Sequence, residues 1–105
     1  MIIYNVTINI DDSVHDQWLT WMMEEHIPQM MELGLFWKAK LVKVLVVEEN
    51  GSTYSIQYFT ENKEKLEEYY KNHAPKMREE GMRRFGDKML AFRTELELLK
   101  EFKTI

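Results

Sequence analysis

The chain has 105 residues, no cysteine and a formal net charge of −4, with 45% hydrophobic and 30% charged residues. This balance predicts one globular domain over residues 1–105, and the missing thiols exclude disulfides and thiolate metal sites. The acidic balance disfavours nucleic acid or an anionic membrane as a partner. Met1 leads straight into a strand-like run and no apolar stretch could cross a membrane, so we expect a soluble cytoplasmic protein.

Residues 2–10 alternate between apolar and polar side chains. The apolar set runs over the even positions from Ile2 to Ile10, which predicts a strand with one covered face. Asn5 and Thr7 belong to the opposite, mostly polar face. We therefore expect Asn5 and Thr7 to point away from the core.

A helix is expected to follow and to end at Gly34, a natural residue for a helix C-terminus. Its apolar arc is wider than contact with one sheet requires, which predicts a second contact, either with the other helix or with a partner chain. His26 falls inside this arc. Pro28 lacks a backbone donor, so the helix should kink or restart there.

Residues 36–47 are rich in Val and Leu and predict a second strand, and residues 53–60 alternate and predict a third. Asn50-Gly51 between them favours a hairpin, so these strands should pair antiparallel. Residues 61–80 carry a narrow apolar stripe, which predicts a second helix ended by Gly81.

A last strand is expected over residues 88–102, after a turn at Gly86-Asp87. Its alternation separates an apolar set that includes Leu90 and Phe92 from a charged set that includes Arg93. We expect the apolar set to meet the helices, which would leave Arg93 on the open face of the sheet.

The two helical segments share a pattern at a constant offset. Four positions of the first recur 47 residues later in the second: His26 and His73, Pro28 and Pro75, Met30 and Met77, Gly34 and Gly81. An internal repeat fits the order β-α-β-β-α-β, a ferredoxin-like α+β fold built from two βαβ halves. Right-handed crossovers would put both helices on one face of a four-stranded antiparallel sheet, with the first and third strands central.

The sheet face without helices should then carry Asn5, Thr7, Gln57 and Arg93. It could be an ordinary solvated face. Alternatively, two such sheets pack face to face in a homodimer and enclose a cavity lined by these polar groups. The second strand is apolar on both faces, which is a poor composition for an exposed edge, and this favours the homodimer.

Several motifs carry a resemblance to a known family: Y-N-V-T-I-N-I at the start, W-x-x-W-M-x-x-E-H-I-P, N-H-A-P, and R-R-F-G with A-F-R-T-E-L-E at the end. On these motifs nearly the whole chain resembles a family of short bacterial proteins known only as a domain of unknown function. That family looks like part of the dimeric α+β barrel superfamily, which includes small monooxygenases, haem-degrading enzymes, lactone isomerases and stress-responsive binding proteins. The resemblance implies two ferredoxin-like protomers and a pocket, but no substrate.

His26 is the candidate catalytic residue, because imidazole titrates near neutral pH and can act as a base. The alternative is a structural histidine that bonds a carbonyl freed by Pro28. Arg93 is the candidate anion clamp, and its alternative is pairing with Glu95 or Glu97. Further ligand-binding candidates are Asn5, Thr7, Gln57, Trp37 and His73.

Trp37 could instead belong to the core or an interface, and His73 could share a structural role with His26. Asn5 and His73 resemble two members of the Asn–Trp–His set of haem-degrading relatives. The third strand offers no tryptophan for that set, so haem chemistry is disfavoured. Scattered histidines and the absence of known metal or phosphate motifs predict neither a metal nor a cofactor.

The sequence therefore predicts a small homodimer that binds a small organic ligand in a cavity at the sheet face. The alternative is a cofactor-independent monooxygenase or isomerase of the dimeric α+β barrel type. In that enzyme His26 would be the base, Arg93 would hold an anionic group, and Asn5 and Gln57 would donate hydrogen bonds to an oxyanion.

Overall fold

The computed structural model describes residues 1–47 and 49–105. Its strands form one antiparallel sheet in the order β2-β3-β1-β4, with these bounds: β1 Ile2–Ile10, β2 Lys38–Lys43, β3 Ser52–Thr60 and β4 Met89–Glu97. The first and third strands are central, as predicted. Val6 of β1 lies opposite Ile56 of β3 on one side and Arg93 of β4 on the other.

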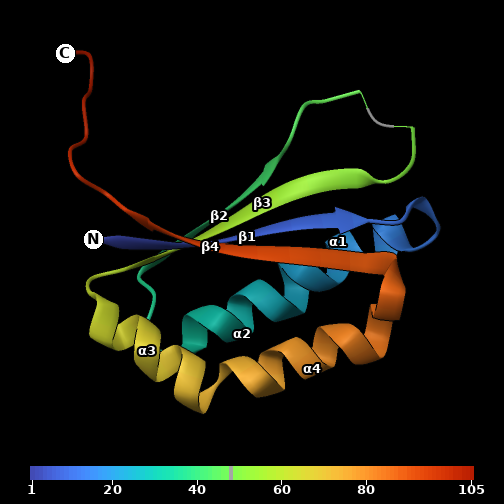
Figure 1. Cartoon of the computed structure of the whole chain (residues 1–105), viewed down its shortest axis with the longest axis horizontal. Helices are drawn as coiled ribbons and strands as arrows, with labels where there is room; N and C mark the ends of the chain where they lie inside the picture. The colour runs from blue at the N-terminus through green and yellow to red at the C-terminus, as the bar shows by residue number, and fades with distance from the viewer. Residues whose placement is uncertain (48) are drawn as a thin grey trace.

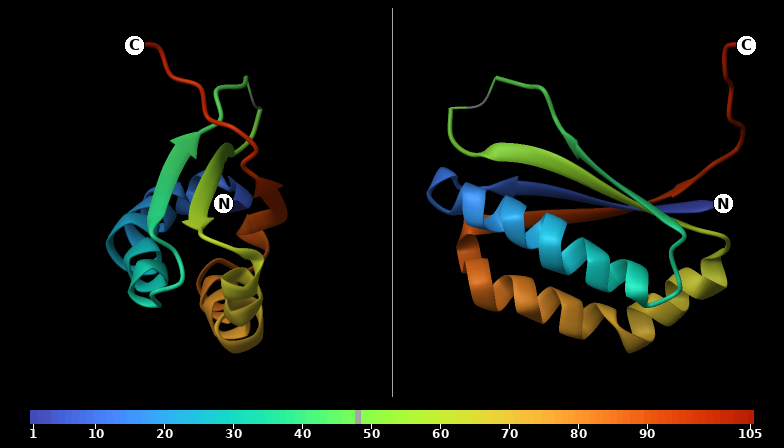
Figure 2. Two further views of the ribbon diagram at one scale, coloured as in Figure 1. Left: turned by 90° about the vertical axis from the view of Figure 1, so that its left-hand side faces the viewer. Right: turned by 180° about the vertical axis from the view of Figure 1, so that it is seen from behind.

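Helical turns fill the two long connections. After β1 come η1 Asp12–Val14, α1 His15–Trp21, η2 Met22–His26 and α2 Ile27–Glu32, and after β3 come α3 Lys63–Asn72, α4 Ala74–Phe85 and η3 Gly86–Lys88. Both helical segments lie under the same face of the sheet, and the other face is bare (Figure 1 and Figure 2). This is the predicted ferredoxin-like α+β architecture.

The core lies between the sheet and the helices. The even positions of β1 and β3 point into it, which is the strand alternation expected of a half-covered sheet. Tyr4, Ile56 and Tyr58 from the strands meet Trp18 and Leu66 from the helices, and all of these side chains are fully buried.

Two strands are shorter than predicted. β2 covers Lys38–Lys43 rather than residues 36–47, and β4 ends at Glu97 rather than at residue 102. The pairing of β4 with β1 ends where the backbone N–H of Leu98 donates to the carbonyl of Met1, 3.0 Å away. Residues 98–105 then turn away from the sheet and are exposed. β2 and β3 pair antiparallel as predicted. Glu48, which stands between the predicted second strand and the Asn50-Gly51 turn, lies outside the described residues.

The second helix is broken, so the prediction of one helix over residues 61–80 is wrong. α3 ends before His73, whose φ of −130° is not helical, and α4 begins with Pro75 in its first turn. Proline cannot donate to the preceding turn and its ring would strike the carbonyl four residues back. A new helix that starts at Ala74, with Pro75 in its first turn, avoids both problems.

Gly81 does not end the helix, contrary to the prediction. It lies inside α4, where a Cβ would come within 2.9 Å of the Met89 methyl group and 3.8 Å of the Trp21 ring. The helix instead ends at Gly86, whose φ of 56° belongs to the left-handed region. Gly34, with a φ of 76°, does end α2 as predicted. The two glycines of the repeat therefore do different jobs.

The two sets of β4 side chains point to the opposite sides of the sheet from those predicted. Paired residues of an antiparallel sheet point to the same side. Arg93 is paired with the buried Val6 and therefore faces the helices, whereas Phe92 is paired with Thr7 and lies on the open face. The prediction that Arg93 lies on the open face is therefore wrong.

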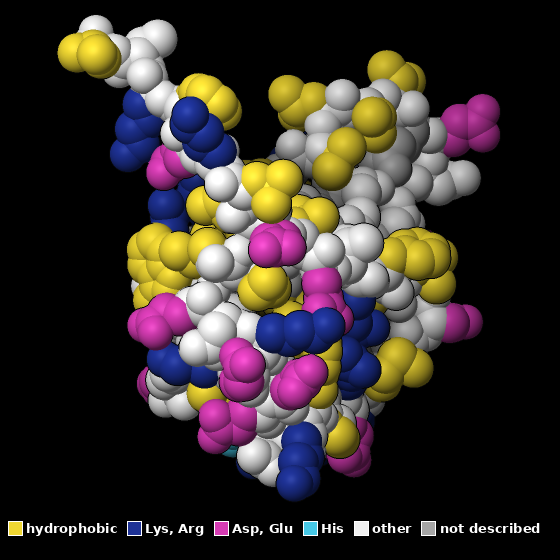
Figure 3. Space-filling view, turned by 60° about the vertical axis from the view of Figure 1, so that its left-hand side comes forward, with side chains coloured by type: hydrophobic (Ala, Val, Ile, Leu, Met, Phe, Trp, Pro, Cys, Tyr) yellow, Lys and Arg dark blue, Asp and Glu magenta, His cyan; other side chains and the backbone are white. Residues whose placement is uncertain are grey.

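The open face and the segments beside it carry exposed apolar side chains. Leu90, Phe92 and Leu96 are 54%, 67% and 43% exposed along β4. Residues 44–47 after β2 and the C-terminal segment, residues 98–105, extend beyond the sheet (Figure 1) and carry further apolar side chains. Figure 3 shows hydrophobic side chains on the projecting parts of the surface.

Candidate functional site

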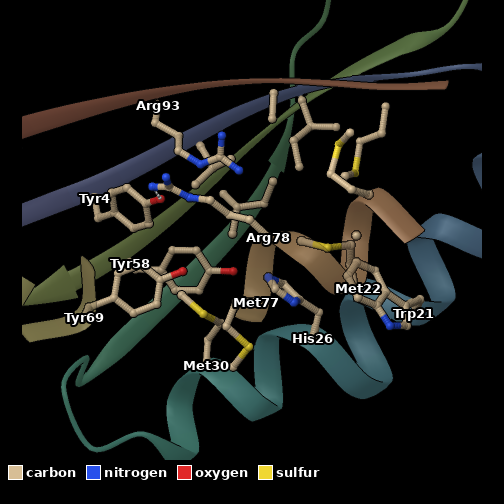
Figure 4. Close-up of a pocket in the computed structure, with 17 residues that line it drawn as sticks. Tyr4, Trp21, Met22, His26, Met30, Tyr58, Tyr69, Met77, Arg78 and Arg93 are labelled. Atoms are coloured by element: carbon tan, nitrogen blue, oxygen red, sulfur yellow. Dashed lines mark hydrogen bonds between the residues drawn. The ribbon is translucent and has the colours of Figure 1, made fainter. Parts of the chain in front are cut away.

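A cavity of about 270 Å³ lies between the sheet and the helices of the single chain. Figure 4 shows its lining side chains pointing inward from the strands above and the helices below. Most of its wall is apolar, formed mainly by Val6, Ile8, Met22, Met30, Ile56 and Met77. Polar groups enter it at a few positions only: His26, Arg78, Arg93 and three tyrosines. An apolar wall with a few converging polar groups is the usual composition of a small-molecule site.

His26 reaches the cavity from a π-helical turn. η2 inserts this wider turn between α1 and α2, and the backbone N–H of Ile27 donates to the carbonyl of Met22, five residues back. Pro28 in the first turn of α2 accounts for the change of register, because it cannot continue an α-helical ladder. Single π-turns inside α-helices are frequent at functional sites.

The His26 ring is held by stacking rather than by hydrogen bonds. Its centroid lies 4.7 Å from that of Trp21, with the two planes 28° apart. Its Nδ1 is buried and has no hydrogen-bond partner among the described residues. The structural alternative from the sequence, in which His26 bonds a carbonyl freed by Pro28, therefore finds no support in the contacts of this side chain.

The pKa of His26 is lowered to about 4, mainly by burial; Glu80 acts in the opposite direction, and the nearby charge of Arg93 contributes to the lowering. The ring is therefore neutral at pH 7, so one of its nitrogens is a hydrogen-bond acceptor.

Three tyrosines form the end of the cavity beside α3. Tyr4 lies with its ring centroid 6.0 Å from Tyr58 and 5.5 Å from Tyr69. Burial raises the pKa of Tyr58 and of Tyr69 well above that of an exposed tyrosine. Both phenols therefore stay protonated at physiological pH and can donate hydrogen bonds.

Two arginines enter the cavity from opposite layers, Arg78 from α4 and Arg93 from β4. Arg78 Nη2 donates to the hydroxyl of Tyr4 at 3.3 Å, and its guanidinium lies 5.9 Å from the ring centre of Tyr70. The charges of both arginines act on Tyr69. Figure 4 shows both guanidinium groups directed into the same part of the cavity, beside Tyr4.

The other predicted ligand residues of the sheet lie on its open face, away from the cavity. Asn5 accepts from Ser55 Oγ at 2.6 Å and donates to the hydroxyls of Thr7 and Thr94, both at 3.2 Å. Gln57 is paired with Asn5 and shares this face. These groups form a polar strip in which hydroxyl and amide side chains bond one another.

Trp37 and His73 do not line the cavity either. Trp37 is 53% exposed before β2, where its ring packs 5.9 Å from that of Phe59. His73 sits at the junction of α3 and α4. Asn5 on the open face and His73 on the helical layer lie on opposite sides of the sheet, so the haem-type set is not assembled. Among the described residues, no three histidine or carboxylate side chains are grouped to hold a metal ion.

A family model described as a domain of unknown function, DUF4286, matches residues 1–99. The chain belongs to this family. No curated protein matches the sequence. Among the described residues, no helix is long and apolar enough to cross a membrane.

Solved structures show the same fold as this DUF4286 chain at low sequence identity. HapK from Hahella chejuensis has a TM-score of 0.74 at 9% identity, over 100% of this chain and 99% of its own. A dimeric ferredoxin-like protein from an uncultured marine organism has a TM-score of 0.68 at 11% identity, over 99% and 100% of the two chains. An EthD family protein from Bacillus halodurans has a TM-score of 0.66 at 11% identity, over 92% and 100%.

Sequence reasoning missed Arg78, Tyr58 and Tyr69 as cavity residues. The spacing of Arg78 was the available signal. On α4 it lies four residues after Ala74 and three before Gly81, both of which are buried, so it shares their helix face. Because this buried face was not recognised in the sequence, Arg78 could not be told apart from the other charged residues of the second helix.

Proposed function

We propose that this protein binds a small organic molecule in the cavity between its sheet and its helices. The observation that carries the proposal is a preformed apolar cavity of about 270 Å³ into which His26, two arginines and buried tyrosines converge. A cavity of about 150 Å³ is large enough to hold benzene. The volume therefore suits a ligand with one ring and a substituent.

The methionines allow this proposal to be tested without knowing the natural ligand. Met30 and Met77 are buried at the cavity wall, whereas Met23 is 54% exposed on η2 and does not line it. In protein labelled with ¹³C at the methionine methyls, a mixture of single-ring aromatic compounds should shift the signals of Met30 and Met77 but not that of Met23. Unchanged cavity signals across such a mixture would refute the proposal.

The second candidate function is a cofactor-independent monooxygenase or isomerase. One observation favours it: His26 and Arg93, the predicted base and anion clamp, do line one cavity. The predicted oxyanion donors Asn5 and Gln57 lie on the other sheet face, so they have no part in this candidate. A histidine with a pKa of about 4 is also a weak base at pH 7, which favours binding over catalysis.

Proton abstraction can be measured directly on a 2-oxo acid probe. If His26 is a base, the protein should accelerate the exchange of the benzylic protons of phenylpyruvate for deuterium, and His26→Gln should remove the acceleration. If the probe binds but the exchange rate with wild-type protein equals the rate in buffer, the enzyme candidate is wrong and the binding function remains.

We further propose that two copies associate through the open sheet face. Leu90, Phe92 and Leu96 form an apolar row on β4, beside the polar strip around Asn5. Exposed apolar rows next to satisfied polar groups are typical of protein interfaces. One of the matching folds is described as a dimeric ferredoxin-like protein, which is consistent with this arrangement.

A further inference from the structure

The charged groups of the cavity are all of one sign. Arg78 and Arg93 line it, and no acidic side chain of the described residues does. The chain as a whole carries a net charge of −4, so this local excess of positive charge runs against the composition. The positive charge of the cavity therefore reflects the residues placed there and does not follow from the overall composition.

The two guanidinium groups have no acidic partner among the described residues. Glu95 lies two residues from Arg93 on the same face of β4, but its carboxylate accepts a hydrogen bond from the hydroxyl of Tyr70 at 3.1 Å. Neither arginine makes an ion pair with any described residue. Two like charges directed into one partly apolar cavity repel each other unless an anion lies between them.

The surroundings of the arginines match an anion attached to a ring. Arg78 is oriented by its bond to the Tyr4 hydroxyl and by the Tyr70 ring, so its donors are already directed. The methionines and aliphatic side chains of the wall offer dispersion contacts but no hydrogen bonds, which suits an aromatic body. At the far side of the cavity the neutral His26 offers one acceptor.

We propose that the natural ligand is a single-ring aromatic acid, bound as its anion with the carboxylate between Arg78 and Arg93 and the ring against the apolar wall. This inference rests on the proposed function and names the class of molecule for the same cavity. A hydroxyl on the ring, opposite the carboxylate, would reach toward His26 and donate to it.

A matched pair of probes separates the charge from the ring. 4-Hydroxyphenylacetate and its amide have the same ring and nearly the same shape, and only the first is an anion at pH 7. Calorimetric titration of the full-length protein should give a dissociation constant for the acid that is about tenfold or more below that of the amide. The difference should shrink as salt is raised, because the contacts are electrostatic.

Substitutions then assign the discrimination to the two arginines. Arg78→Met and Arg93→Met should each reduce the preference for the acid to about threefold or less, and Arg93→Lys should retain part of it. Arg83→Met is the matched control, because Arg83 is an exposed arginine of the same helix that does not line the cavity, and it should leave the preference unchanged.

The outcomes distinguish this inference from the proposed function. If the acid and the amide bind equally well and both shift the Met30 and Met77 methyl signals, the anion class is wrong and the cavity still binds small molecules. If neither probe nor any of their unsubstituted ring analogues shifts those signals, the proposed function is wrong as well. A preference for the acid that survives both arginine substitutions would also overturn the inference.

Discussion

At the scale of single residues, the most informative group is His26. Its neutral ring stacks on Trp21 inside the protein, where burial disfavours the imidazolium form. Folding therefore holds the pKa of His26 near 4, compared with an ordinary value of 6.5. A histidine kept neutral in this way links the stability of the fold to pH.

We predict that His26 makes the protein less stable in mild acid. Between pH 6.5 and 4 the unfolded chain binds a proton at this residue and the folded chain does not, so the free energy of unfolding falls as the pH drops through this window. The expected contribution is about 2–3 kcal/mol. Urea unfolding at pH 7 and pH 4 measures it.

The control for this prediction is another histidine. His26→Gln should lose this part of the pH dependence, whereas His73→Gln, at the half-exposed junction of α3 and α4, should keep it. Any other source of pH dependence is shared by all three proteins, so the comparison isolates His26. If wild type and His26→Gln lose the same stability on acidification, the ring is not held neutral by burial.

Some residues of the site could be predicted from the sequence and others could not. His26 could be selected because a polar residue inside a wide apolar arc, two positions before a proline, is unusual. Its neighbours in the cavity could not be selected in the same way. Arg78 and Tyr69 lie on either side of the break at His73, so a single continuous helix over this region gives the wrong relation between their faces.

At the scale of secondary-structure elements, helix α4 shows how two glycines of one sequence differ. Gly81 is helical and contacts Met89, whereas Gly86 has a φ of 56° and a ψ of −132°, a combination that side chains with a Cβ rarely adopt. The sequence pattern favoured Gly81 as the end of the helix because its repeat partner Gly34 ends one. The structure assigns that job to Gly86.

We predict that alanine substitutions will rank the two glycines accordingly. Gly86→Ala should lower the free energy of unfolding by about 1–3 kcal/mol through backbone strain. Gly81→Ala should change it by less than about 1 kcal/mol, because the gain in helix propensity offsets the displacement of the flexible Met89 side chain. Thermal or urea unfolding of both variants gives the ranking, and the reverse order would make Gly81 the helix terminator after all.

Strand β4 explains why alternation alone misplaced Arg93. The sheet order and the central strands could be predicted because β1 and β3 bury only one set of side chains. β4 is an edge strand with apolar residues on both faces: Met89 and Ala91 toward the helices, Leu90 and Phe92 toward the open side. The larger apolar set points outward, so the usual rule that this set meets the core gives the wrong face.

At the scale of the whole molecule, the outward apolar row of β4 predicts the oligomeric state. Burial of Phe92 and its neighbours against a second sheet would remove apolar surface from water and stabilise a dimer. We expect native mass spectrometry to give twice the chain mass of 12.7 kDa. Phe92→Glu should shift the population to the monomer, because a charge would be buried in the interface.

Met23→Glu is the matched control for this substitution. Met23 is 54% exposed, close to the 67% of Phe92, but lies on the helical layer. It should leave the dimer intact at the concentration where Phe92→Glu dissociates. A wild-type monomer at micromolar concentration would contradict the face-to-face arrangement and return the open face to solvent.

The cavity and the proposed interface lie on opposite faces of one sheet. Ligand binding should therefore survive the loss of the dimer. We predict that monomeric Phe92→Glu binds 4-hydroxyphenylacetate within about threefold of the wild-type affinity, measured by the same calorimetric titration. A larger loss would mean that the partner's sheet holds β4, and with it Arg93, in its binding position. In that case dimer formation would be needed to position Arg93 for ligand binding.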